Sequence, residues 1–257
     1  MNYETLRLDV ADGIATVTLE RPPVNAQNRQ SREEIIHLFD SLGDREDVRC
    51  VILASALNVF SAGADVKERV GLVQQPGDYV RHNRITREYF YAISDCAKPV
   101  IAAVNGAAFG AGFVLALACD IVVASEEAYF VMPELDVGLA GGAGFLMQHF
   151  SRSMARYIYF TARRIPAAEL YRLGVITAVL PADRLMAEAR AIAADIAAKS
   201  PGAVRAVKRA FNVVEEMPVR DAYRYEQTIT VDLSKTEDTR EAQRAFVEKR
   251  KPKFTGR

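Results

Sequence analysis

The chain has 257 residues, of which 50% are apolar and 26% are charged, and this composition is ordinary for a globular protein and excludes wholesale disorder. Lysine plus arginine (33) equals aspartate plus glutamate (33), so the formal net charge is zero. Nucleic acids and anionic membranes need a basic surplus in the proteins that bind them, and we therefore expect neither as a partner.

The three cysteines, Cys50, Cys96 and Cys119, lie far apart and form no Cys-x-x-Cys pair, and the three histidines are equally scattered. This spacing predicts buried free thiols in a reducing compartment, with neither a disulfide framework nor a metal site. The first residues show no basic stretch followed by an apolar one, so no signal peptide is predicted. We therefore expect a cytoplasmic protein.

The predicted elements begin with a strand pair. Alternating apolar residues at 6–10 and 14–19, joined by an Asp-Gly turn signal, predict a β-hairpin. Apolar residues at helical spacing then predict a helix that ends at Gly43, and 51–53 follow as a short buried strand. A helix that ends near Cys96 comes after a polar loop.

Residues 99–119 include no charged side chain, and a stretch of this length is long enough to span a membrane. Proline, asparagine and three glycines interrupt it, however. A buried strand at 100–104, a glycine-rich bend and a buried helix at 113–118 explain the stretch better. With a further strand at 120–124, the recurring order of strands and helix predicts an α/β core.

After Pro181 the pattern becomes helical, since Leu185, Ala189, Ile192 and Ile196 fall on one helix face. We therefore predict a core at 1–180 and a helical region at 181–257, without a flexible linker between them. The helices of this region either pack on their own chain or cover a neighbouring subunit.

The first segment with chemical potential is the bend at Gly110, Ala111 and Gly112, which joins a predicted strand to a predicted helix. The first amides of a helix have no internal partner, and small side chains let a ligand oxygen approach them. The bend therefore predicts a site for an anion, or for an oxygen that becomes one. Close packing of the helix on a sheet would explain the same glycines.

A second bend of small residues lies at 60–67. Asp65 and Glu68 have the spacing of a helix capping box, which is the structural explanation for both. If this bend aims a second amide at the same ligand oxygen, the two amides form an oxyanion hole. One such donor is worth about 3–4 kcal/mol of transition-state stabilisation.

The third segment is a carboxylate among apolar neighbours, Glu134, which follows Val131, Met132 and Pro133. Burial there would raise its pKa towards neutrality, as a general acid/base requires. Asp136 would share its face if the backbone is extended. A solvated charge in a loop is the alternative interpretation.

In their order and spacing, these segments resemble the enoyl-CoA hydratase/isomerase (crotonase) superfamily over essentially the whole chain. The motifs that carry the resemblance lie at 22–26, 60–67, 105–112, 119–120, 133–134, 161–165 and 246–254. The resemblance implies an α/β fold, a crotonase-like spiral of ββα turns with a C-terminal α-helical trimerisation region. It also implies a homo-oligomer, as a trimer or a dimer of trimers.

The resemblance further implies an acyl-CoA thioester as substrate, with coenzyme A as part of the substrate, no separate cofactor and no metal. The oxyanion amides fall on Ala64 and Ala111, and the acid/base on Glu134. The substrate-binding positions of the family fall on Val24, Ala26, Ala62, Gly63, Asp65, Val66 and Gly110.

The chain departs from the hydratase pattern at one position. Hydratases of this family use two glutamates, and the second of these positions is Val114 here; a further acidic position of some members is Gly142. A single glutamate suffices for Δ3-Δ2-enoyl-CoA isomerisation, which the resemblance therefore favours.

Two alternatives stay open. One is a hydratase whose second acid is replaced by Asp136 or by a residue of 74–90, and the stretch 216–223 resembles carnitinyl-CoA dehydratases. The other is a non-catalytic acyl-CoA-binding protein or an RNA-binding relative, although the zero net charge disfavours the second of these.

Overall fold

The computed structural model describes residues 3–256, and its centre is a six-stranded sheet with the order β1-β2-β3-β4-β6-β9. β1 and β2 are antiparallel, and all other neighbours in this sheet are parallel. The strands are β1 (Leu6–Ala11), β2 (Ile14–Leu19), β3 (Cys50–Ser55), β4 (Val100–Val104), β6 (Ile121–Ser125) and β9 (Ala178–Leu180).

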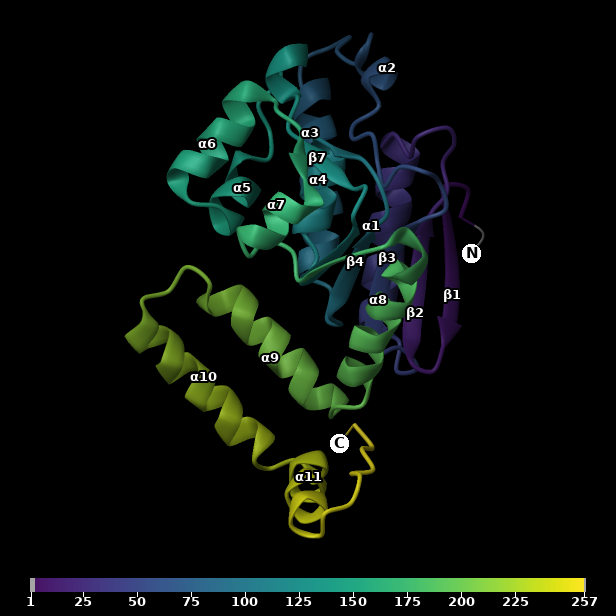
Figure 1. The fold of residues 1–257 in the computed structure, drawn as a ribbon. Helices are drawn as coiled ribbons and strands as arrows, with labels where there is room; N and C mark the ends of the chain where they lie inside the picture. Colours follow the sequence, from purple (N-terminus) through teal and green to yellow (C-terminus); the bar gives the residue numbers. More distant parts are fainter. Residues whose placement is uncertain (1–2, 257) are drawn as a thin grey trace.

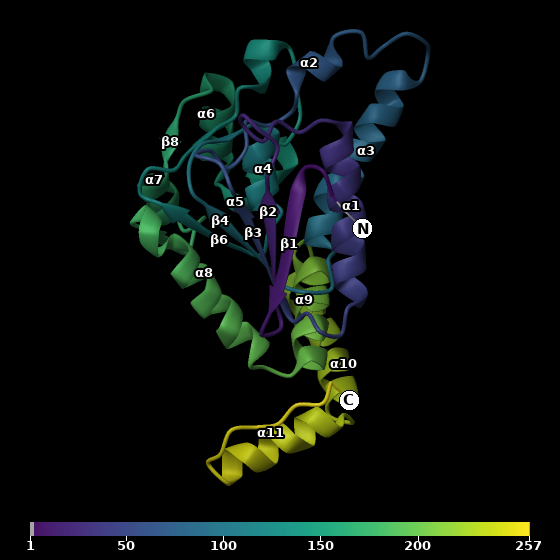
Figure 2. The ribbon, with the colours of Figure 1, turned by 90° about the vertical axis from the view of Figure 1, so that its right-hand side faces the viewer.

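Both faces of this sheet are buried, which is why its parallel strands are continuous apolar runs. Cys50, Ile52 and Ala54 point to the face covered by α8 (Ala182–Ala197). Val51 and Leu53 point to the opposite face, where α1 (Arg29–Asp44) and α3 (Asp78–Ser94) pack against each other and close the main core. Figure 2 shows the sheet between these two helical layers.

A second, three-stranded sheet carries the loops that matter for chemistry. It has the order β5-β7-β8 and lies beside α4 (Ala111–Leu117). The short 3-10 helix η1 (Glu134–Val137) follows β7, and α2 (Val66–Arg69) follows Ser61, which forms a β-bridge with β5. The remaining elements of this part are β5 (Ala108–Phe109), β7 (Tyr129–Val131), α5 (Ala143–His149), α6 (Arg152–Thr161), β8 (Ile165–Pro166) and α7 (Ala167–Arg172).

The last three helices extend away from the core, as the yellow-green end of the ribbon in Figure 1 shows. They are α9 (Pro201–Val214), α10 (Val219–Leu233) and α11 (Glu237–Val247), and α10 packs along α9. α9 is tied to the core by the ammonium of Lys208, which lies 2.7 Å from the Asp120 carboxylate and donates to the Lys98 carbonyl. The division of the chain into a core at 1–180 and a helical region at 181–257 stays a prediction. α8, the first helix after residue 181, packs on the central sheet and so contributes to the core.

The sequence predicted this architecture well. The strand pair, the helix that ends near Gly43, the central strands and the C-terminal helices are all present. The uncharged stretch at 99–119 is strand, bend and helix as predicted, and no helix in the described part of the chain is both long and apolar enough to cross a membrane. The three cysteines are buried and free, and no cluster of potential metal ligands occurs among residues 3–256.

Two local expectations were wrong. The capping box is only half formed: the Asp65 side chain caps α2, but Glu68 accepts the Arg29 amide instead of returning to the Asp65 backbone. The backbone at Glu134 is not extended but forms η1, so Asp136 does not share its face and is exposed to solvent. A 3-10 turn places residues two apart on different sides of the chain.

Candidate active site

The structure brings the two bends of small residues into direct contact. The Phe109 amide donates to the Ser61 carbonyl over 2.9 Å, and Ser61 and Ala108 form a parallel β-bridge. Gly63 adopts φ +80°, and a β-carbon there would collide with the Phe109 carbonyl and lie 3.3 Å from the Ala111 nitrogen. Only glycine combines this conformation with so close an approach of two backbones.

The amides of Ala64 and Ala111 remain without an acceptor among residues 3–256, although their neighbours are bonded. On either side of Ala64, Gly63 accepts from the Gln27 amide over 2.7 Å and Asp65 donates to the Gln27 carbonyl over 3.1 Å. Ala111 is the first residue of α4, where a helix amide has no partner within the helix. Two main-chain donors from separate loops, which contact each other, are thus without an acceptor in the described structure.

Glu134 lies against the start of α4. Its carboxylate fills the space over Gly110, whose φ of +48° and ψ of −115° suit only glycine, and a β-carbon there would collide with the carboxylate. Burial raises the pKa of Glu134 to about 7, against which its own backbone amide and the charge of Arg69 act more weakly. Its Oε2 is buried and has no hydrogen-bond partner in the described structure. The predicted acid/base group therefore sits next to one of the two free amides, with a pKa suited to neutral conditions.

The two inert positions lie next to this carboxylate and touch each other. Val114 lies one helical turn after Gly110 and is 2% exposed. A β-carbon at Gly142 would lie only 2.7 Å from Cγ2 of Val114. The loop that carries Gly142 is held by the Tyr159 hydroxyl, which donates to the Gly141 carbonyl and accepts from the Gly141 amide. Neither Val114 nor Gly142 carries an ionisable side chain.

The remaining predicted contact residues also gather at the two bends. The Ala62 amide donates to the Val24 carbonyl over 2.9 Å. Arg21 donates from Nη1 to the Ala26 carbonyl over 2.7 Å, and its Nη2 lies 2.9 Å from the Asp65 carboxylate. Val24 and Val66 keep exposed side chains, which leaves apolar surface beside the free amides.

Sequence reasoning missed three side chains, two of them close to Glu134 (Tyr159 and Arg69) and one close to Arg69 (His82). Tyr159 lies in α6, Arg69 ends α2, and His82 is buried in α3. No motif singles them out, because each comes from a different element and reaches the site only through the tertiary fold.

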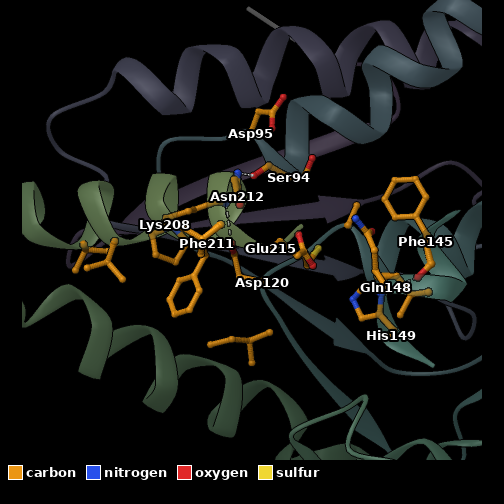
Figure 3. Close-up of a pocket in the computed structure, with 18 of the residues that line it drawn as sticks. Ser94, Asp95, Asp120, Phe145, Gln148, His149, Lys208, Phe211, Asn212 and Glu215 are labelled. Carbon is orange, nitrogen blue, oxygen red and sulfur yellow. Dashed lines mark hydrogen bonds and ion pairs between the residues drawn. The ribbon is translucent and has the colours of Figure 1, made fainter. Parts of the chain in front are cut away.

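A large cavity of the structure is a different feature. It measures about 1600 Å³ and lies between α9, α8 and the core, where the C-terminal end of α4 also lines it. Figure 3 shows Lys208 and Asn212 of α9 bonded to Asp120 and Ser94 of the core, with Phe211 beside them. Neither free amide nor Glu134 lines this cavity, so we do not assign the chemistry to it.

Known proteins resemble this chain over almost its whole length. The model of the family "Enoyl-CoA hydratase/isomerase" matches residues 9–257. A (7aS)-7a-methyl-1,5-dioxo-2,3,5,6,7,7a-hexahydro-1H-indene-carboxyl-CoA hydrolase of Rhodococcus jostii is 38% identical, over 94% of this chain and 93% of its own. A protein of Mycobacterium bovis named "Probable enoyl-CoA hydratase" is 34% identical over the whole of both chains. The crystal structure of an enoyl-CoA hydratase from Bacillus anthracis superimposes with a TM-score of 0.93 at 31% identity, over 99% of this chain and 100% of that one.

Proposed function

The chain belongs to the enoyl-CoA hydratase/isomerase family, and on that premise we propose that it isomerises an enoyl-CoA thioester, with Glu134 as the only acid/base side chain. The observation that carries the proposal is the environment of Glu134. Its buried carboxylate adjoins the amide of Ala111, while the adjacent side is filled by Val114 and Gly142, which cannot transfer protons.

The reaction needs one base and one oxygen-binding site. The Glu134 carboxylate removes a proton from C2 of a 3-enoyl-CoA, and the negative charge that develops on the thioester oxygen is stabilised by the amides of Ala64 and Ala111. The resulting dienolate takes the proton back from Glu134 at C4, which moves the double bond to C2–C3. A pKa of about 7 suits both halves, since the same group must lose and accept a proton at neutral pH.

Coenzyme A enters this mechanism as part of the substrate. The proposed contacts for its adenine and pantetheine parts are Val24, Ala26, Ala62, Gly63, Asp65, Val66 and Gly110. Main-chain groups dominate this set, and their mutual hydrogen bonds support a preformed site.

The second candidate is addition of water or hydrolysis, which the names of the relatives favour. Glu134 Oε2, an acceptor without a partner in residues 3–256, is a suitable position for a water molecule. In this case Glu134 would act as the base that activates water, without the second carboxylate that orients it.

Separate incubations with a 3-enoyl-CoA and with a 2-enoyl-CoA, both in water labelled with ¹⁸O, distinguish these functions. The proposal expects a 2-enoyl-CoA without ¹⁸O, and loss of this activity in Glu134→Gln. ¹⁸O at C3 as the main result would identify a hydratase, and ¹⁸O in a free acid with release of coenzyme A would identify a hydrolase. Binding without any turnover would identify a binding protein.

We also propose a homo-oligomer assembled through the C-terminal helices. Large apolar side chains on α9, α10 and α11 are exposed to an extent unusual for a monomer, with Phe211 68% and Phe246 85% exposed. Light scattering should give three or six times the mass of one chain, 28.4 kDa. Phe211→Asp should reduce this mass, and a monomeric wild-type protein would refute the proposal.

A further inference from the structure

Next to Glu134, the segment that comprises α2, the following loop and the first turns of α3 carries buried polar atoms without partners. These are Nε of Arg69, Nε2 of His82 and Oε2 of Glu68, in addition to Oε2 of Glu134, as judged within residues 3–256. His82 is only 7% exposed. An unpaired buried polar atom costs about 1–3 kcal/mol, so a group of them points to a ligand that pairs them.

Arg69 carries a charge that this chain does not neutralise. Its Nη1 donates to the Tyr79 hydroxyl over 3.0 Å, and it forms no ion pair in the part of the chain that the structure describes. The neighbouring Arg32 differs, because it donates to the Gln27 carbonyl over 2.6 Å and lies 3.6 Å from the Glu68 carboxylate. Glu68 accepts the Arg29 amide through Oε1, while its Oε2 lies 3.6 Å from Arg32 without a hydrogen bond, and within residues 3–256 it forms no ion pair with Arg69.

Arg69 lies a short way along the chain from the free amide of Ala64. α2 begins directly after the free amide of Ala64 and its cap Asp65, and Arg69 is its last residue, about one helical turn further on. Burial raises the pKa of Glu134, and the positive charge of Arg69 lowers it by a smaller amount. Burial and the charge of Arg32 lower the pKa of His82, and the charge of Arg69 lowers it further. The guanidinium is therefore close enough to act on both groups. Figure 2 shows α2 and the first turn of α3 at the same end of the molecule.

We propose that the acyl group of the substrate carries an acceptor oxygen, in a carboxylate or a ketone, which Arg69 binds with His82 as a second contact. An unsubstituted alkyl chain would leave Arg69 Nε and His82 Nε2 unpaired, and a cationic acyl group would be repelled by Arg69. This inference rests on the proposed function only in taking the substrate to be an acyl-CoA.

Calorimetric binding of saturated acyl-CoA esters of equal chain length tests the inference without requiring turnover. One ester ends in a methyl group, one in a methyl ketone, one in a carboxylate and one in a trimethylammonium group. They are titrated into the wild type, Arg69→Met, Arg69→Lys and the control Arg84→Met, which removes an exposed arginine of α3. A charge-assisted hydrogen bond predicts roughly ten-fold or greater preference of the wild type for an oxygenated ester.

The inference expects this preference to disappear in Arg69→Met and to persist in Arg84→Met. Arg69→Lys should keep part of the preference for the carboxylate, because it keeps the charge but not the planar fork. The inference would be overturned if all arginine variants kept a preference, and kept it for the carboxylate ester alone. It would also be overturned if the wild type bound all four esters with equal affinity. A uniform loss that extends to free coenzyme A would also overturn it, by placing Arg69 at the nucleotide.

The ranking of esters by the wild type stands even if Arg69→Met does not fold. Failure of the isomerase assay would refute the proposed function and leave this ranking intact, so the two failures are distinguishable.

Discussion

Replacement of Glu134 by glutamine removes the proposed acid/base while keeping the size and shape of the side chain. A missing general acid/base typically lowers a rate by about 10²–10⁴-fold. Because the proposal makes Glu134 the only acid/base and Val114 and Gly142 cannot transfer protons, we expect the loss in isomerisation to fall at the upper end of that range.

The pKa of about 7 also predicts the pH dependence of the wild type. The first proton transfer needs the ionised carboxylate, so kcat/KM should fall as pH falls through 7. At pH 6 about a tenth of the molecules carry the ionised form, and the rate should be about a tenth of its plateau. The residual activity of Glu134→Gln should not show this dependence.

The same substitution should change stability in the opposite direction. The carboxyl ionises at 4.5 in the unfolded chain and near 7 in the folded one, so the penalty for its burial is absent below pH 4.5, grows between 4.5 and 7, and is complete above 7. A pKa shift of this size corresponds to about 3 kcal/mol of destabilisation of the folded wild type above pH 7. Glu134→Gln removes this destabilisation but adds about 1 kcal/mol for its unpaired buried amide. Glu134→Gln should therefore be about 2 kcal/mol more stable than the wild type at pH 8 and no more stable than it at pH 4.

Two assays check these expectations together. Isomerisation is followed by the absorbance of the conjugated thioester, and the free energy of unfolding by urea titration at both pH values. Unchanged activity in Glu134→Gln would remove Glu134 from the mechanism. A variant that is less stable than the wild type at pH 8 would refute the claim that burial raises this pKa.

Three further substitutions probe the surroundings. Val114→Glu should make the protein incorporate ¹⁸O at C3 of a 2-enoyl-CoA, and the unpaired buried carboxylate should lower the free energy of unfolding by about 3–5 kcal/mol. The control Val114→Gln should lose less stability and show no incorporation. Equal incorporation by both variants would contradict the role of a second acid. Gly110→Ala should lower isomerase activity by about ten-fold or more and destabilise the fold by about 1–3 kcal/mol, because the new β-carbon strains φ and displaces the Glu134 carboxylate. A fully active variant in the same assays would show that the close approach of Glu134 to Gly110 is not needed. Lys208→Met should cost about 1–3 kcal/mol in urea titration, because it removes the cation from the Asp120 carboxylate, which is 29% exposed and keeps the Val100 amide. A loss below about 1 kcal/mol would mean that solvent replaces the ion pair.

Most of the fold could be predicted from the sequence because its signals are local. Alternation at 14–19 and the apolar run that contains 51–53 fix strands, and the small residues around Gly110 fix a strand-to-helix bend. The identity of Glu134 as a buried carboxylate also follows from its apolar neighbours. These inferences need only what lies within a few residues.

The parts that failed depend on contacts between distant segments. Glu68 does not complete the capping box because Arg29, 39 residues earlier, offers it a backbone amide. Asp136 turns to solvent because η1 forms after Pro133, and a two-residue offset in the sequence does not reveal that turn. Arg69 and His82 reach Glu134 only when α2 and α3 are placed, so their surroundings cannot be inferred from local pattern.

The two free amides belong to the main chain, so no exchange of one side chain for another, proline excepted, removes either donor. A scan of single substitutions at Ala64 and Ala111 would therefore register bulk and strain but not the loss of a charge-stabilising group. Side chains opposite this fixed pair, by contrast, are free to vary in evolution or by design. One invariant device for polarising a thioester can thus be combined with many different reactions, each chosen by what stands across from it.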